Sequence, residues 1–311
     1  MNRFARTMAY FMVGMTIMGG SYYYLDQVFF APTADFTTLG DKEPPKDLKK
    51  AFDYVNVTSG KRYYSHDGAY MAVVEEKSAK IYKANDKNSE IKVDLRDKEI
   101  SFFEWMPDRN LAILALHAGT TVTLEQFNPE NPEHKTDTDI EKLPRGSKIV
   151  DMAYSTATNV IYMKVEVGPN QYRVYRTDAN YDTRRIYVQA ENIGRLAVFY
   201  DEDKFFYDNL RTGDVYMYND ATGGWRAINP AGAYRLIGVD KEKNIYVAAV
   251  DKEGKATSVS RGKLGVGFAQ LYTYATPVEV GSITVANALE EYAKKTAEKP
   301  ADKGATNTKK Q

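Results

Sequence analysis

Apolar residues are distributed along most of this chain in short runs. Between residues 51 and 285, runs rich in Val, Ile, Tyr and Phe alternate with turns rich in Asp, Asn and Gly. Runs of this length and composition predict β-strands joined by tight turns. No segment of this region keeps a sustained apolar period of 3.6 residues, so we expect no crossover helices between the strands. The pattern therefore predicts an all-β domain over residues 51–285.

The predicted strands recur as a unit. A strand, a polar turn and a second apolar strand occur in five successive segments, at a period of about 40–49 residues, which is the length of a propeller blade. A third strand carries a β-branched residue, Tyr, two residues and then Asn or Asp, as in 81–86 and 215–220. With a fourth strand in each unit, the pattern predicts a β-propeller of about five four-stranded blades. The second strands begin near Tyr70, Leu111, Val160, Phe205 and Ile245.

The Asp67-Gly68 turn between inner strands and the Tyr-x-x-Asn/Asp third strand resemble those of propellers of the TolB and WD40-like type. The resemblance covers residues 52–285 but lacks the Trp-Asp dipeptide of WD40 repeats, and it implies a fold without an activity. A sixth, partial blade and a two-sheet sandwich remain alternatives. Phe52–Val57 predicts an additional strand, and its pairing beside Ser282–Val285 would close the ring and remove the exposed sheet edges.

The N-terminal pattern is different, because Met8–Leu25 contains no charged residue. A run of about 18 residues is near the lower limit for a membrane-spanning helix. Arg3 and Arg6 precede the run and Asp26 follows it, and basic flanks stay on the cytoplasmic side. We predict a single-pass anchor in residues 1–30 of a cell inner membrane, with the N-terminus cytoplasmic and the propeller extracytoplasmic. A cleaved signal peptide, for which a good cleavage site is lacking, and a buried soluble helix are the alternatives.

The segments that flank the propeller are polar. Residues 31–50 contain Pro44, Pro45 and a run of charges, which predicts a linker. After the propeller, residues 286–299 are good helix formers, and Asn287 and Glu290 have the spacing of a capping box. Residues 300–311 are of low complexity and are expected to form a disordered tail.

Composition narrows the possible chemistry. The 42 Lys and Arg residues balance 42 Asp and Glu residues, which argues against a nucleic-acid partner. The chain has no Cys, which excludes disulfides, thiolate metal sites and Cys nucleophiles. The three His residues lack the spacing of metal ligands, and Gly262–Gly267 is interpreted as a hairpin turn because it lacks the context of a phosphate loop. We expect no catalytic residues, no cofactor and no metal.

Two acidic clusters, 137–139 and 201–203, are without the spacing of an EF-hand and are expected to be solvated turns. The long polar loop Asn128–Lys142 interrupts the second blade, and long loops in compact domains are often functional. The candidate interaction residues in this loop are Asn128, Glu130, Glu133, His134, Asp137 and Asp139.

The favoured function is a membrane-anchored interaction or scaffold module, or an accessory subunit of a membrane complex, with protein partners in or near the membrane. The alternative is a propeller that binds a small ligand or a glycan in its central channel, and an enzyme ranks third. A ligand site would gather polar side chains with shifted pKa values at one mouth of the channel. An interaction module would instead expose an apolar or Tyr-rich patch.

Overall fold

The computed structural model describes residues 14–15, 18, 46–133 and 135–297. The predicted C-terminal tail and almost all of the predicted anchor and linker lie outside these residues. Within the described part, no helix is both long enough and apolar enough to cross a bilayer. Residues 46–50, at the end of the segment expected to be a linker, form the short helix α2 (Lys46–Ala51) together with Ala51. Residues 46–297 belong to one structural unit, which contains all the strands described below.

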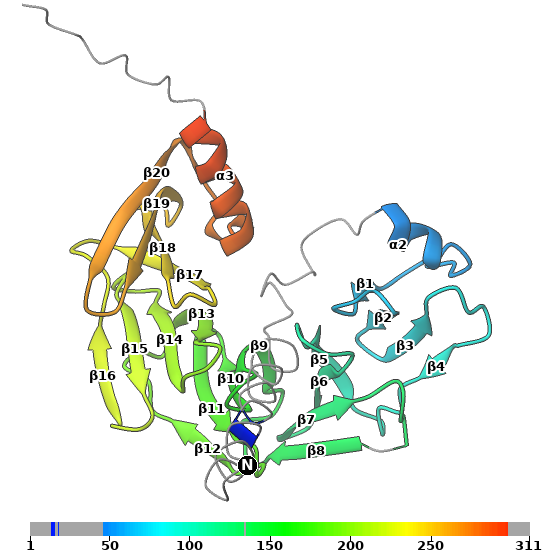
Figure 1. The fold of residues 1–311 in the computed structure, drawn as a ribbon. Helices are drawn as coiled ribbons and strands as arrows, with labels where there is room; N and C mark the ends of the chain where they lie inside the picture. Colours follow the sequence, from blue (N-terminus) through cyan, green and yellow to red (C-terminus); the bar gives the residue numbers. More distant parts are fainter. Residues whose placement is uncertain (1–13, 16–17, 19–45, 134, 298–311) are drawn as a thin grey trace, which may run out of the picture. The chain divides into compact units, whose positions relative to one another are not determined.

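Five four-stranded antiparallel sheets follow one another along the chain, and in each the order of strands in the sheet is their order in the sequence (Figure 1). This is the architecture of a five-bladed propeller, and the sheets are called blades 1 to 5. Blade 1 contains β1 (Lys61–Tyr64), β2 (Tyr70–Glu75), β3 (Ser78–Lys83) and β4 (Ile91–Lys92), and blade 2 contains β5 (Glu99–Trp105), β6 (Ala112–Ala118), β7 (Thr121–Phe127) and β8 (Lys135–Ile140). Blade 3 contains β9 (Lys148–Ser155), β10 (Val160–Gly168), β11 (Gln171–Thr177) and β12 (Thr183–Ile186). Blade 4 contains β13 (Ile193–Val198), β14 (Lys204–Asn209), β15 (Val215–Asn219) and β16 (Gly224–Ala227), and blade 5 contains β17 (Tyr234–Val239), β18 (Ile245–Val250), β19 (Ala256–Lys263) and β20 (Gly267–Val278).

The second strand of an inner blade is buried on both faces, because a neighbouring blade covers each side. In β6, Ala112, Leu114 and Leu116 pack into the hydrophobic cluster between blades 1 and 2. The intervening Ile113 and Ala115 pack into the cluster between blades 2 and 3. Side chains alternate along a strand, so one strand supplies two cores, and its residues form a continuous apolar run.

The first strand of each of blades 2 to 5 contains a β-bulge. One additional residue interrupts the pairing of β5 with β6, of β9 with β10, of β13 with β14 and of β17 with β18. The pairing of β1 with β2 is regular. Because a bulge bends a strand and redirects its side chains, blades 2 to 5 share a feature that blade 1 lacks.

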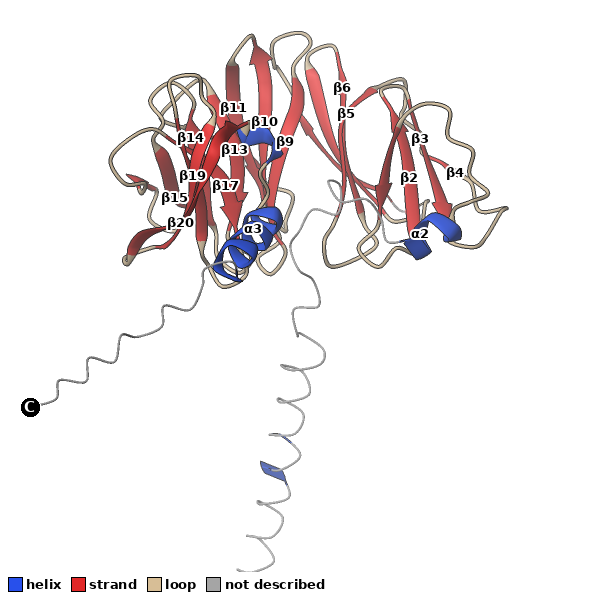
Figure 2. Cartoon of the chain, turned by 90° about the horizontal axis from the view of Figure 1, so that it is seen from above, coloured by secondary structure: helices blue, strands red, loops and turns tan. Residues whose placement is uncertain are grey.

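The ends of the series of blades are covered by helices. Four hydrophobic clusters join successive blades, and a fifth joins blade 5 to the helix α3 (Val285–Ala297) through Ala288 and Ile283. Among the described residues, no such cluster joins blade 5 to blade 1. At the other end α2 packs on blade 1, where a Cβ at Gly68, which has φ +72°, would collide with the side chain of Leu48. Figure 2 shows α2 and α3 beside the two end blades.

The predicted closing strand is therefore wrong. Phe52 directly follows α2 and is buried against the ring of Tyr64, at 5.8 Å between centroids, and the residues up to Val57 form turns and irregular chain. The proposed partner segment consists of the end of the 3₁₀ helix η3 (Val280–Ser282) and the start of α3. Its apolar residues cover blade 5. The segment therefore has the composition of a strand but does not pair as one.

The C-terminal helix is present, but its cap differs from the prediction. The backbone nitrogen of Thr284 donates to Asn287 Oδ1 at 2.8 Å, and the backbone nitrogen of Asn287 donates to Thr284 Oγ1 at 3.2 Å. This reciprocal pair makes Thr284 the N-cap. The predicted pairing of Asn287 with Glu290 placed the cap three residues too late.

Candidate functional site

A groove opens between blades 2 and 3, at the end of the sheets where the β5–β6, β7–β8, β9–β10 and β11–β12 turns lie. Its cavity has a volume of about 260 Å³. Ile113, Leu124 and Ile161 line it and are buried, so they form its deep apolar part. The hydroxyl groups that line this interblade groove belong to Thr136, Thr138, Tyr154, Ser155, Thr156 and Thr177.

Thr177 is the most informative of these residues. It is the last residue of β11, it is 2% exposed, and its Oγ1 atom has no hydrogen-bond partner among the residues that the structure describes. A buried hydroxyl without a partner costs about 1–3 kcal/mol, so native proteins leave few of them. A ligand in the groove that offered a hydrogen bond to Oγ1 would remove this cost.

Two tyrosines border the groove. Burial raises the pKa of Tyr154 well above its usual value, and the nearby carboxylates of Glu104 and Asp108 raise the pKa further. The Tyr154 hydroxyl therefore stays neutral at physiological pH and can both donate and accept a hydrogen bond. Tyr181 is 45% exposed and has a left-handed backbone with φ +62°, a conformation that is uncommon for a bulky residue and is concentrated at functional sites.

Asp178 holds Tyr181 in this conformation. The backbone nitrogen of Tyr181 donates to the Asp178 carbonyl oxygen at 2.9 Å. The Asp178 carboxylate accepts from the backbone nitrogens of Asn180 at 2.9 Å and Asp182 at 3.3 Å. The hydrogen bond from Asn180 is the main cause of the lowered pKa of Asp178, so this side chain stays ionised and the turn keeps its shape.

The charges at the groove are largely compensated within the protein. Arg109 Nη2 lies 2.8 Å from a carboxylate oxygen of Asp108, and Arg176 Nη1 lies 3.5 Å from one of Asp178. The groove can therefore offer hydroxyls, the amides of Gln126 and Asn159, and aromatic surface, with little net charge. This combination suits a neutral polar ligand that also has an apolar face.

The predicted interaction loop is shorter than expected. Residues 135–140 form β8, so Asp137 and Asp139 lie on a strand. Asp137 accepts a hydrogen bond from Arg96 Nη1 at 2.7 Å, and Asp139 accepts one from Thr123 Oγ1 at 2.5 Å. The cluster 137–139 is thus a set of paired carboxylates rather than a solvated turn. Thr136 and Thr138 alternate with these residues and line the groove.

The remaining loop, 128–134, borders the same end of the blades. Asn128 Oδ1 accepts a hydrogen bond from the backbone nitrogen of Glu130 at 2.9 Å and shapes the turn. Glu130 lines a second, more open depression with Tyr70 of blade 1. Glu133 is exposed, and His134 lies outside the described residues. The role of this loop in binding remains a prediction.

The acidic cluster 201–203 also has structural partners. Asp203 accepts hydrogen bonds from Arg176 Nε and Nη2 at 2.9 and 2.7 Å and from the Tyr162 hydroxyl at 2.5 Å. Lys243 contacts both Asp201 and Glu202. These contacts link blade 4 to blades 3 and 5. The predicted turn is present and Asp201 is exposed, but Glu202 and Asp203 are only partly exposed. The interpretation of Gly262–Gly267 as a hairpin turn is confirmed, because β19 pairs with β20 across it.

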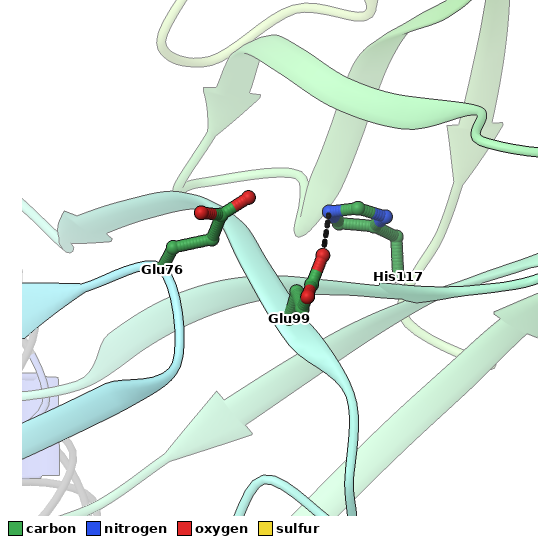
Figure 3. Close-up of side chains that lie close together, drawn as sticks. All are labelled: Glu76, Glu99 and His117. Carbon is green, nitrogen blue, oxygen red and sulfur yellow. Dashed lines mark ion pairs between the residues drawn. The ribbon is translucent and has the colours of Figure 1, made fainter.

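A cluster that the sequence reasoning missed lies between blades 1 and 2, at the opposite end of the sheets from the groove. Glu76, Glu99 and His117 bring their ligand atoms within 4.8 Å of one another (Figure 3). The three residues are far apart in the sequence, so no linear spacing reveals them. The hairpin register could have found two of them, since Glu99 and His117 are directly paired in β5 and β6.

No protein-family model and no curated protein matches this sequence. Among solved structures, the chain is similar to dipeptidyl peptidase 4 from Porphyromonas gingivalis, with 13% identity, a TM-score of 0.48, and coverage of 71% of this chain and 40% of that chain. A putative TolB from Agrobacterium tumefaciens gives 13% identity and a TM-score of 0.46, over 70% of this chain and 81% of that chain. The WD40 repeats of RRP9 give 10% identity and a TM-score of 0.46, over 68% and 62%. This chain thus spans less than two thirds of the peptidase and of the RRP9 chain. Similarity at this level assigns no activity, and the propeller architecture rests on the five sheets themselves.

Proposed function

We propose that the protein is a non-catalytic binding module of the propeller type, held at the extracytoplasmic side of a membrane by its N-terminal segment, with the interblade groove as its recognition site. The observation that carries this proposal is the buried Thr177 Oγ1, which lacks a hydrogen-bond partner within the described part of the chain. The groove gathers polar side chains, as a ligand site requires. In contrast, three of the exposed large apolar residues are separated along the chain: Tyr187 follows β12, Val266 lies in the β19–β20 turn, and Leu289 lies on α3.

The chemistry of the groove favours a neutral ligand with several hydroxyl groups, such as one sugar ring of a glycan. A cavity of about 260 Å³ is at the small end of ligand pockets, which span roughly 300–1,000 Å³. Hydroxyl and amide side chains would bond the ligand hydroxyls, and Tyr181 would cover an apolar ring face. This proposal places the ligand between two blades rather than in a central channel.

A protein partner is the second candidate, which makes the chain a scaffold or an accessory subunit of a membrane complex. The loop 128–134 favours it, because Pro129 and Glu130 of this loop line the depression on blade 1. A partner that docked on this end of the blades would contact the loop and both hollows together.

The variant Thr177→Val separates recognition from folding, because Val has nearly the same shape and lacks the hydroxyl. Full-length protein in detergent is titrated with a panel of neutral mono- and disaccharides by calorimetry. We expect one or more sugars to bind, Thr177→Val to weaken that binding by about two- to tenfold, and the melting temperature to stay equal or rise because an unsatisfied group is removed. The control is Thr222→Val, in an exposed turn.

Absence of saccharide binding would refute the glycan proposal. Binding that Thr177→Val leaves unchanged would move the site away from the groove. If no saccharide binds but shortening of the 128–134 loop releases a co-purifying membrane protein from otherwise folded protein, the partner proposal takes its place.

A further inference from the structure

We propose that Glu76, Glu99 and His117 form a binding site for a divalent transition-metal ion, with Zn²⁺ as the best fit, and that this ion joins blade 1 to blade 2. The site is independent of the interblade groove. The residues come from three elements: the β2–β3 turn of blade 1, and strands β5 and β6 of blade 2.

The hairpin register places two of the three ligands. Glu99 and His117 are cross-strand partners at the start of β5 and near the end of β6. Directly opposed residues of an antiparallel pair project from the same face. His117 Nε2 lies 3.9 Å from Glu99 Oε2, and both side chains are partly buried (Figure 3).

The third ligand is brought in by a contact between the blades. The backbone nitrogen of Ile100, next to Glu99, donates to the carbonyl oxygen of Glu76 at 2.6 Å. This hydrogen bond fixes the β2–β3 turn against β5, so the backbone of Glu76 is held beside the Glu99–His117 pair. Glu76 itself is exposed, and its carboxylate can rotate toward the other two ligands.

The distances fit a site that contracts slightly when it binds an ion. The ligand atoms lie within 4.8 Å of one another. Metal–ligand bonds of about 2.0–2.1 Å in a tetrahedron place ligand atoms about 3.3 Å apart. Rotations of two glutamate side chains provide a contraction of this size without any change in the backbone.

The donor set decides which ion is preferred. One imidazole nitrogen and two carboxylate oxygens suit Zn²⁺, whereas Mg²⁺ and Ca²⁺ prefer sites made of oxygen alone. Three protein ligands leave a fourth position for water or for a group of a bound partner.

Lys77 would compete with a metal ion for the Glu99 carboxylate. Its Nζ atom lies 3.0 Å from Glu99 Oε1, and its side chain is 77% exposed. Ion pairs this exposed contribute little to stability, so the ammonium group can move into solvent when an ion enters. Removal of Lys77 therefore distinguishes a metal site from an ordinary ion-pair cluster. In a metal site, the affinity for the ion should rise because a competing cation is gone. In an ion-pair cluster, the only effect should be the loss of a stabilising contact.

The place of the site in the fold gives the ion a structural role. Blade 1 ends the series, and in the described part of the chain the one hydrophobic cluster that it shares with another blade is with blade 2. An ion bound by residues of both blades stabilises their contact by the free energy of its binding to the folded form.

The test uses untagged full-length protein in detergent, freed of metal with a chelator and titrated with Zn²⁺ and Co²⁺ by calorimetry and visible absorption. We expect one ion per chain, a rise in melting temperature with Zn²⁺, and binding of Ca²⁺ and Mg²⁺ at least tenfold weaker. His117→Ala and Glu99→Gln should each weaken Zn²⁺ binding at least tenfold, and Lys77→Ala should tighten it severalfold. The matched control is His66→Ala, which should leave the affinity unchanged.

Three results would each overturn the proposal. One is the absence of stoichiometric Zn²⁺ binding to the metal-free protein. Another is Zn²⁺ binding that survives His117→Ala in protein with an unchanged β-sheet spectrum. The third is a Lys77→Ala variant that melts at a lower temperature and binds Zn²⁺ no better than the parent.

Discussion

At the scale of single residues, charged groups buried between blades 3, 4 and 5 depend on one another. Asp208 is 1% exposed, and one carboxylate oxygen accepts a hydrogen bond from the backbone nitrogen of Arg195 at 3.0 Å. Lys164 donates from Nζ to the carbonyl oxygen of Gly194 at 2.8 Å. A Cβ at Gly194 would overlap the Asp208 carboxylate. Glycine is therefore required there by the close approach of a charged side chain.

Asp208 makes stability depend on pH. Burial raises its pKa to about 6, although Arg235, the hydrogen bond from Arg195 and Lys164 act in the opposite direction. The folded protein thus binds this proton more tightly than the unfolded chain, whose Asp pKa is about 3.9. Stability from this group rises as the pH falls from about 7 toward 4. We expect the unfolding free energy of the parent, relative to Asp208→Asn, to increase between pH 7 and pH 5 in urea titrations. A difference that is constant with pH, or that decreases, would show that the carboxylate is not desolvated.

At the scale of elements, the pattern of the sequence predicts the strands well, because each second strand is an apolar run and the turn before it carries Asp, Asn or Gly. The buried residues of the second strands follow from this pattern, and Ala112, Leu114, Ile161, Phe206 and Val247 are all in the core. The pattern fails where an apolar segment is buried by a helix or by its neighbours, as at Phe52, since composition does not say which surface covers a side chain.

The candidate sites could not be predicted because they depend on contacts between blades. The interblade groove combines residues from strands and turns of two blades, and the lack of a partner for Thr177 Oγ1 among the described residues is a property of the packed structure. The Glu76–Glu99–His117 cluster likewise needs the contact between the β2–β3 turn and β5. A single sequence gives the register within a hairpin more readily than the alignment of one blade on the next.

The helix α3 provides a prediction at this scale. Ala288 is fully buried against blade 5, whereas the adjacent Leu289 is 36% exposed. We expect Ala288→Asp to destabilise the protein by several kcal/mol, because it places an unpaired charge in the cluster. Leu289→Asp should change the unfolding free energy by about 0.5 kcal/mol or less. Denaturant unfolding of both variants measures the difference, and equal effects would show that α3 does not cover blade 5.

At the scale of the whole molecule, the described residues form a series of blades whose two ends are covered by helices. In repeat proteins each unit contacts its neighbours, and the terminal units need a capping element. Here α2 and α3 have this role for blades 1 and 5. Such a domain has its own core from one end to the other, so it should fold without the N-terminal segment.

The proposed anchor is tested at the same scale. We expect the full-length chain to stay in the membrane pellet after washing with carbonate, because the uncharged run Met8–Leu25 is long enough to span a bilayer. A chain that starts at Lys46 should instead be soluble, rich in β-structure by circular dichroism, and cooperative in melting. Recovery of a soluble chain that begins near Asp35 from cells that express the full-length form would indicate cleavage in place of anchoring.

The two-sided burial of the second strands has a consequence for the evolution of this fold. Leu114 contributes to the core shared with blade 1, and the adjacent Ile113 contributes to the core shared with blade 3. Substitutions at such neighbouring positions should therefore be compensated on opposite sides, each by changes in a different blade. An insertion of a single residue in β6 would exchange the two faces and disturb both cores at once. In homologous sequences we expect length changes to accumulate in the turns and outer strands, while the second strands keep their length. A substitution in a second strand should be accompanied by a substitution in the blade that its side chain contacts.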